Sequence, residues 1–286
     1  MSKQVVIRKI EDGFEPEHIF ECGQCFRWKR EADGSYTFVA FGKVVNVLKK
    51  DGYAIFSNTN EEEFENVWHQ YFDLNTDYSK IKNTLLNVDE NLKKATHFGS
   101  GIRILKQDLW ECVVSFIISA NNNIPRIQGI IERLCESFGK EIEYSGKKYY
   151  TFPESKDIVG DLSHLRAGYR DSYIKDACEA FISGKFSGIE NLSTEEARKL
   201  LLTIKGIGPK VCDCILLFGL NRREVFPVDV WVKRTLNELY KDEVSKTTPH
   251  KFAENKFGDL AGYAQQYLFY YMREMGANET GGVKNA

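Results

Sequence analysis

An amine and a carboxylate each stand at the start of a predicted helix in the second half of this chain. Lys210 lies in the first turn of a helix that opens at Pro209, and Asp229 precedes the next helix, 19 residues later. The positive end of a helix dipole favours a free amine over an ammonium ion, and it favours a carboxylate over the neutral acid. A free lysine amine can form a Schiff base, and a carboxylate beside it can stabilise positive charge. The pair is therefore suited to attack on a sugar carbon.

The turn before this lysine has the composition of a phosphate-binding site. A capping box at Ser193 starts the previous helix, and Gly206, Ile207 and Gly208 join the two helices. So short a connection makes the helices pack side by side and leaves backbone N–H groups exposed at a helix N-terminus. An ordinary tight turn between helices has the same composition, so the phosphate-binding interpretation depends on the amine and the carboxylate nearby.

Two kinds of hydrophobic pattern predict the elements that position these residues. The first sixty residues alternate β-type runs with turn signals, which predicts an antiparallel meander of hairpins. After Asn60 a 3.6-residue period predicts helices for most of the chain. The predicted strands span residues 26–30, 36–41, 44–48 and 53–56, the predicted helices span 109–120, 126–138 and 171–183, and residues 147–151 are extended.

These elements predict an α+β protein in which an N-terminal antiparallel sheet precedes two helical regions that meet at a cleft. Residues 1–100 form the sheet domain with flanking helices, and residues 101–276 form the helical catalytic region. Residues 277–286 form a disordered tail. We expect Lys210 and Asp229 at the mouth of the cleft between the two helical lobes.

The charge of the chain is uneven. With 42% hydrophobic and 28% charged residues, the composition is that of an ordinary soluble globular protein. The net charge of -2 excludes indiscriminate coating of nucleic acid, but residues 197–235 carry eight basic side chains against three acidic ones. This local excess predicts contact with a few phosphates and a modest dependence of binding on salt.

We expect an intracellular protein. The chain contains no apolar run long enough to span a membrane, and no signal-peptide core follows Met1. Its seven cysteines, an odd number, fit free thiols in a reducing compartment. Cys22 and Cys25 form a CxxC pair, but without a second pair or nearby histidines we do not expect metal or redox use.

The hairpin and the residues around it resemble a known family. The run Ile204–Lys210, followed by Pro-Val-Asp ending at Asp229, is similar to the helix–hairpin–helix, Gly/Pro-rich loop and Asp motif of the HhH-GPD base-excision DNA glycosylases. The subgroup with a lysine at this position is bifunctional. The resemblance implies that Lys210 attacks the anomeric carbon, expels the base and holds the sugar as an imine that permits β-elimination. It also implies that Asp229 stabilises the developing sugar cation and assists proton transfer.

Further segments resemble the 8-oxoguanine DNA glycosylases of the eukaryotic type, which carry a TBP-like N-terminal sheet. The segment Gly-Gln-Cys-Phe-Arg-Trp begins at Gly23, and the resemblance implies that the Gly23 carbonyl accepts the N7 proton of the oxidised purine. It also implies that Gln265 bonds the Watson–Crick edge, that Phe269 stacks on the extruded base, and that Cys214 lies on its other side. Taken singly, these residues also fit a turn before a strand, a core helix and core filling.

Four residues resemble the family's contacts to the DNA left behind after base extrusion. The resemblance implies that Asn121 fills the vacated stack and that Arg126 reads the orphaned cytosine. It also implies that Tyr169 wedges beside the widowed base and that Arg170 joins the cytosine contacts. Such side chains offset an unstacking cost of a few kcal/mol. Singly, they also fit a helix C-cap, surface charges and a core aromatic.

Two positions depart from the family pattern, and three other protein classes share parts of it. Trp231 replaces a histidine that contacts phosphate, and Cys25 replaces a serine. An endonuclease-III-like enzyme would end in a four-cysteine iron–sulfur loop, but no cysteine follows Cys214. A 3-methyladenine-type glycosylase lacks the lysine, and a non-catalytic DNA-binding module would give Lys210 and Asp229 no role.

The resemblance also implies the partners and cofactors. The expected partner is double-stranded DNA that contains oxidised guanine, with cytosine opposite the lesion, and we expect a monomer. No organic cofactor and no metal site of side chains is implied. A structural cation on backbone carbonyls of the hairpin turn is compatible with the sequence.

Overall fold

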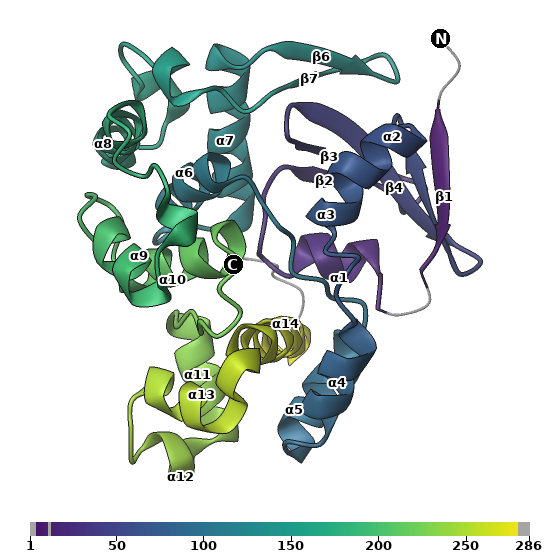
Figure 1. Ribbon diagram of the computed structural model, residues 1–286, viewed down its shortest axis with the longest axis vertical. Coiled ribbons are helices and arrows are strands. Elements are labelled where there is room, and N and C mark those ends of the chain that lie inside the picture. Colours follow the sequence, from purple (N-terminus) through teal and green to yellow (C-terminus); the bar gives the residue numbers. More distant parts are fainter. Residues whose placement is uncertain (1–3, 11–12, 280–286) are drawn as a thin grey trace.

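The computed structural model describes residues 4–10 and 13–279. It places an antiparallel sheet beside a larger helical part, as Figure 1 shows. The five strands run in the order β1-β5-β4-β3-β2, and all paired neighbours are antiparallel. Their bounds are β1 (Val5–Lys9), β2 (Trp28–Arg30), β3 (Tyr36–Ala40), β4 (Lys43–Lys50) and β5 (Tyr53–Ser57).

The strand register explains the core of the sheet. Val47 on β4 lies opposite Tyr36 on β3 and Phe56 on β5, and all three are at most 1% exposed. Because side chains alternate between faces, this register puts each strand's largest apolar residues on one side. The turns that join these strands, such as Asp51-Gly52, have positive φ at both residues, as two-residue hairpins require. The predicted meander is thus present.

One strand and one helix at the N-terminus were not predicted. Strand β1 pairs only with β5 at the sheet edge, and Val5 and Ile7 are 46% and 55% exposed. Helix α1 (Pro16–Glu21) is too short to show a helical period. It lies with α2 (Glu61–Glu63), the π-helical turn η1 (Phe64–Trp68) and α3 (His69–Tyr71) beside the sheet (Figure 1).

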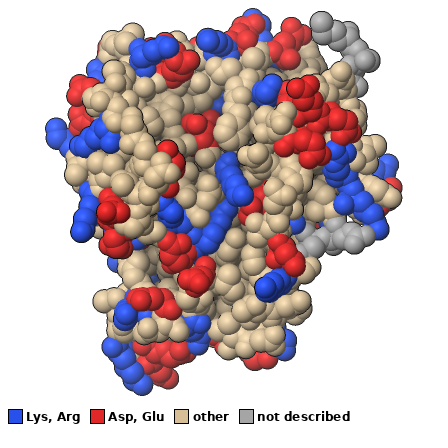
Figure 2. Space-filling model, in the orientation of Figure 1, with Lys and Arg blue, Asp and Glu red and all other residues tan. Residues whose placement is uncertain are grey.

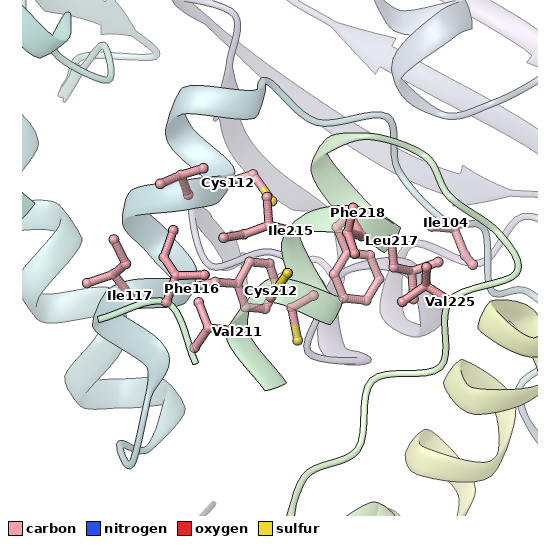
Figure 3. Packing of buried hydrophobic residues seen from close by; sticks show 14 of the residues in the cluster. Ile104, Cys112, Phe116, Ile117, Val211, Cys212, Ile215, Leu217, Phe218 and Val225 are labelled. Carbon is pink, nitrogen blue, oxygen red and sulfur yellow. The ribbon is translucent and has the colours of Figure 1, made fainter. Parts of the chain in front are cut away.

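The helical part surrounds a second core. At its centre is α6 (Leu109–Ser119), which is buried on every side from Cys112 onward. Figure 3 shows its residues facing those of α10 and of the π-helical turn η5 that continues it. The helices are α4 (Tyr78–Leu86), α5 (Glu90–Phe98), α6, α7 (Ile124–Phe138), α8 (Arg170–Ile182), α9 (Thr194–Leu201), α10 (Pro209–Cys214) with η5 (Ile215–Gly219), α11 (Val230–Leu239), α12 (Lys241–Val244), α13 (Pro249–Phe257) and α14 (Ala261–Glu279).

Several segments join the two cores. The short hairpin of β6 (Glu141–Tyr144) and β7 (Lys147–Tyr150) reaches toward the sheet, where Lys147 pairs with Glu31 at 3.2 Å. Helices α4 and α5 precede residue 100, but their buried side chains belong to the helical core. The predicted domain boundary at residue 100 therefore assigns α4 and α5 to the sheet domain, although their buried side chains pack in the helical core.

The C-terminal helix extends further than predicted. Helix α14 continues to Glu279, so the first three residues of the predicted tail are helical, and residues 280–286 lie outside the described residues. None of the described helices combines the length and the apolar character needed to cross a membrane.

Candidate active site

The predicted nucleophile lies in the first turn of α10. Pro209 is the first residue of this helix, and Lys210 follows it, half-buried. The Lys210 ammonium nitrogen lies 5.6 Å from the centroid of the Phe116 ring on α6. The Lys210 amine therefore lies at the start of a helix, as the sequence predicted, and it faces an aromatic ring.

The two hairpin glycines serve different purposes. Gly206 has φ +86°, and a Cβ there would lie 2.6 Å from a ring carbon of Tyr173. A side chain at this position is excluded by contact as well as by backbone conformation. Nothing lies within 4 Å of a Cβ built on Gly208, which is exposed. The helix N-terminus beside Gly208 is thus open to a phosphate.

Asp229 is the N-cap of α11, as predicted. Its Oδ1 accepts a hydrogen bond of 2.7 Å from the backbone N–H of Val232, and the residue is half-buried. This bond fixes the carboxylate at the positive end of the helix.

A buried thiol lies one turn after the lysine. Cys214, one turn after Lys210, is 4% exposed, and burial raises its pKa to about 11. The Lys210 charge acts against this rise and the Asp229 charge adds to it, so both groups lie within electrostatic reach of the thiol. The predicted nucleophile and base-contacting cysteine thus share one side of α10, and the predicted carboxylate begins the next helix, α11.

Two predicted base-binding residues are in contact across the two cores. Gly23 has φ +81°, and a Cβ built on it would lie 3.2 Å from a ring carbon of Phe269 on α14. The adjacent Gln24 is fully buried: its amide donates to the carbonyls of Ile19 and Arg103, each at 2.8 Å, and accepts from Leu105 N. These bonds hold the Gly23 backbone against the ring.

We expect Gly23→Ala to impair base recognition more than folding. The positive φ costs alanine about 1–2 kcal/mol, and the new methyl group would press on Phe269. Excision of a lesion base should fall much further than cleavage at an abasic site, which needs no base pocket. Rates on duplexes carrying each site would test this, with Gly34→Ala as the control because that glycine also has positive φ but an open surround. Equal losses on both substrates would contradict the assignment of Gly23.

The third predicted base contact is oriented by its neighbour. Gln265 is 5% exposed, and its Oε1 accepts a hydrogen bond of 2.9 Å from Nε2 of Gln266. The Gln266 Oε1 is buried and has no hydrogen-bond partner among the described residues. The bond from Gln266 fixes the orientation of the Gln265 amide, whose oxygen has a second lone pair for a donor and whose NH₂ group can donate.

The four predicted contacts to the remaining DNA lie together, but they differ in exposure. Asn121, with φ +50°, and Arg126 are exposed, and Tyr169 is 55% exposed. Arg170 is only 3% exposed and donates to the carbonyls of Ala120 and Asn121. Its guanidinium carbon lies 4.4 Å from the Tyr169 ring centroid. In this conformation Arg170 holds the Asn121 turn.

The exposed tyrosine is also linked to the hairpin. The rings of Tyr169 and Tyr173 meet edge to face at 5.6 Å, and Tyr173 packs against Gly206. No motif in the sequence singled out Tyr173. Its position one turn after Tyr169 on α8 was the only available signal.

The two departures from the family pattern have structural partners. The Arg234 guanidinium carbon lies 5.4 Å from the centroid of the Trp231 ring, which gives the first turn of α11 a stacked cation. Cys25 is buried in the sheet core, and burial raises its pKa well above the usual value. Burial raises the pKa of Cys22 to about 12. Both thiols of the CxxC pair thus remain protonated near neutral pH.

A buried carboxylate anchors the catalytic helix. Asp213 is 1% exposed, accepts from Arg198 on α9 and lies 2.9 Å from Nε2 of His250 on α13. We expect Asp213→Ala to lower the free energy of unfolding by about 1–3 kcal/mol, because the half-buried Arg198 guanidinium loses its hydrogen bond to a buried carboxylate and keeps the exposed Glu195 as its partner. Urea denaturation would measure this. Glu254→Ala, which removes an exposed pair with Lys251, should change stability little; equal effects would contradict the anchoring role.

Metal ligands of the usual kind are not gathered anywhere in the described ranges, 4–10 and 13–279. No three His, Cys, Asp or Glu side chains there lie close enough to hold an ion. The cation expected on hairpin carbonyls involves no such cluster and stays a prediction.

Comparison with protein families now adds to this geometry. The model of the 8-oxoguanine DNA glycosylase N-terminal domain matches residues 5–113, and that of the HhH-GPD superfamily base excision DNA repair proteins matches residues 114–265. The second match spans more than half of the chain, so the chain belongs to the HhH-GPD superfamily, and the first places it with the 8-oxoguanine glycosylase type. The predicted resemblance and α+β fold are confirmed.

Individual relatives agree. The chain is 30% identical over 244 residues to the probable N-glycosylase/DNA lyase of Methanothermobacter thermautotrophicus, covering 76% of each. It matches the structure of MBOgg1 with a low affinity DNA ligand at TM-score 0.91 and 47% identity, over 96% of this chain and 100% of that one. It matches Clostridium acetobutylicum 8-oxoguanine glycosylase/lyase, bound to DNA with cytosine opposite 8-oxoG, at TM-score 0.87 and 42% identity, with the same coverage.

Proposed function

We propose that this protein is a bifunctional DNA glycosylase and AP lyase that excises 8-oxoguanine from duplex DNA. The Lys210 amine attacks the anomeric carbon of the extruded nucleotide, and the base leaves with the electrons of the glycosidic bond. The resulting imine acidifies the neighbouring sugar carbon, so that β-elimination cleaves the strand. Asp229 stabilises positive charge on the sugar and assists the proton transfers.

The placement of Lys210 in the first turn of α10 and of Asp229 at the N-cap of α11 is the observation that carries this proposal. A plain DNA-binding module has no need of a half-buried amine and a carboxylate, each at a helix start. Gly23 and Phe269 supply the lesion pocket: the glycine carbonyl accepts the N7 proton that only the oxidised purine carries. Unoxidised guanine has a lone pair there, and two facing acceptors repel each other.

The DNA contacts divide between two surfaces. The open helix start at Gly208 binds a backbone phosphate, and Asn121, Arg126 and Tyr169 occupy the gap left by the extruded base. Arg126 favours cytosine on the opposite strand, and Arg170 supports the Asn121 turn. Figure 2 shows a short run of basic side chains near the middle of one face of the molecule, with basic and acidic groups mixed around it. Buried free cysteines and a DNA substrate fit a monomeric enzyme inside the cell.

Borohydride trapping tests the function directly. The protein is incubated with duplexes that contain 8-oxoguanine opposite cytosine, unmodified guanine, 3-methyladenine or an abasic site. We expect a covalent adduct with the first and the last only. An adduct with the abasic duplex alone would mean that the lesion is a different one, and release of 3-methyladenine would favour the alkylated-base class. No adduct with any duplex would favour a DNA-binding module without chemistry.

A further inference from the structure

Arg273 is a buried cation that the proposed mechanism does not use. It lies four residues after Phe269 and eight after Gln265 on α14, so the three residues share one face of the helix. Arg273 is 9% exposed. Burial of a guanidinium is costly unless its charge and its donors are all matched.

The hydrogen-bond partners around Arg273 satisfy only part of its guanidinium group. Its Nη2 donates to the Glu21 carbonyl, and its Nε and Nη2 lie 3.2 and 2.9 Å from Oε1 of Glu274. The remaining nitrogen, Nη1, is buried and has no hydrogen-bond partner among the residues that the structure describes. An apolar side chain would fill this space without an unsatisfied donor, so stability alone does not account for the arginine.

The unpartnered nitrogen lies at the wall of the proposed base pocket. A Cβ built on Gly23 would lie 3.6 Å from Arg273 Nη1 and 3.2 Å from the Phe269 ring. The guanidinium carbon lies 5.5 Å from the centroid of Phe269 and 5.6 Å from that of Tyr270. Arg273 therefore touches the ring expected to stack on the base, and it reaches the backbone segment whose carbonyl is expected to read N7.

We propose that Arg273 is a positioning residue for recognition of the oxidised base. The Arg273 guanidinium donates a hydrogen bond to the carbonyl of Glu21, two residues before Gly23, and it packs on the ring of Phe269. It thereby links the backbone segment that ends in Gly23 to that ring. This link keeps a fixed distance between the Gly23 carbonyl, the proposed hydrogen-bond acceptor, and the Phe269 ring, the proposed stacking surface. The two residues come from opposite ends of the chain. This inference rests on the proposed function, because it assigns both groups to the lesion base.

The two chemical steps separate this role from a general structural one. Excision of 8-oxoguanine needs the base pocket, whereas cleavage at a ready-made abasic site needs the lysine and the phosphate contacts only. Loss of this link between Gly23 and Phe269 should therefore slow the excision of 8-oxoguanine but leave cleavage at the abasic site unchanged. A loss of stability would lower both rates together.

The experiment compares Arg273→Met and Arg273→Lys with wild type in single turnover, on the 8-oxoguanine duplex and on the abasic duplex. Misplacement of about 1 Å can cost about 10²-fold in rate, so we expect excision to fall about 10- to 100-fold. Abasic cleavage should stay within about twofold of wild type, as expected for a step without the pocket. Lysine keeps the positive charge but lacks the planar guanidinium group with its several donors, so Arg273→Lys should have the same effect as Arg273→Met. The lysine variant also provides the test if the methionine variant fails to fold.

Arg8→Met is the matched control. Arg8 pairs with Glu61 and Glu65, and its guanidinium carbon lies 4.5 Å from the Phe64 ring centroid, so it makes the same kinds of contact away from the pocket. We expect its ratio of excision to abasic cleavage to equal that of wild type. An unchanged ratio in both Arg273 variants would overturn the inference. Wild-type protein that cleaves abasic DNA but never excises 8-oxoguanine would instead overturn the proposed function.

Discussion

Replacement of Lys210 by glutamine is expected to abolish both covalent trapping and strand cleavage. Glutamine keeps most of the side-chain length but has no nucleophilic lone pair, so no imine can form. Removal of a covalent nucleophile can cost about 10⁶-fold, and we expect base release to slow by at least about 10³-fold. Single-turnover gels with borohydride, on 8-oxoguanine and abasic duplexes, would measure both products.

A neighbouring lysine provides the control for this experiment. Lys205 lies just before the hairpin, is exposed, and pairs with Asp176 at 3.6 Å. Lys205→Gln removes one positive charge near the same turn but no nucleophile, so trapping should persist. An adduct that survives in Lys210→Gln would show that another amine attacks the sugar, and the proposed mechanism would be wrong.

Replacement of Asp229 by asparagine should give an enzyme that binds its DNA but hardly turns over. Asparagine is as good an N-cap as aspartate, so the bond to Val232 N and the start of α11 should survive. The negative charge that stabilises the sugar cation is lost, and we expect excision to fall by about 10²- to 10⁴-fold, the range typical of a removed acid–base group. Titration with labelled duplex and single-turnover rates separate the two effects.

The choice of asparagine makes the result easy to interpret. Asp108 caps α6 through the N–H of Glu111 in the same way, away from the lysine, so Asp108→Asn is a matched cap variant. Its excision rate should stay near that of wild type. Turnover that remains unchanged in Asp229→Asn would remove this carboxylate from the chemistry and leave it a structural cap.

The parts of the site that the sequence predicted well depend on local rules. Glycine spacing, a proline at a helix start and a capping aspartate determine where α10 and α11 begin, whatever packs around them. Lys210 and Asp229 were therefore placed at helix starts correctly. The meeting of Gly23 with Phe269 came from the family resemblance, since no pattern in the chain links residues so far apart.

The parts that were missed depend on tertiary packing. The contacts of Arg170 inside the protein were not predicted: it donates to backbone carbonyls of a neighbouring turn, and its expected contact with DNA stays a prediction. Gln24 and Arg273 each read as ordinary polar residues, because their importance lies in carbonyls 79 and 252 residues away in the sequence. The sequence of strand β1 shows no apolar/polar alternation, because Val5 and Ile7 on its exposed face are as apolar as the buried Val6. Whether a polar side chain is buried cannot be predicted from the sequence until its hydrogen-bond partners are known.

The pair of tyrosines on α8 has a consequence for the DNA itself. Tyr173 packs on Gly206 of the hairpin turn and on Tyr169, which in turn packs on Arg170, so the proposed phosphate site and the residues proposed to fill the vacated stack are joined by packed side chains. We expect this packed unit to act as a ruler that sets a fixed distance between a bound phosphate and the place of the extruded base. We expect the duplex to deform to fit this ruler, and lesion sites, which are more easily bent and unstacked than intact pairs, to fit it at the least cost.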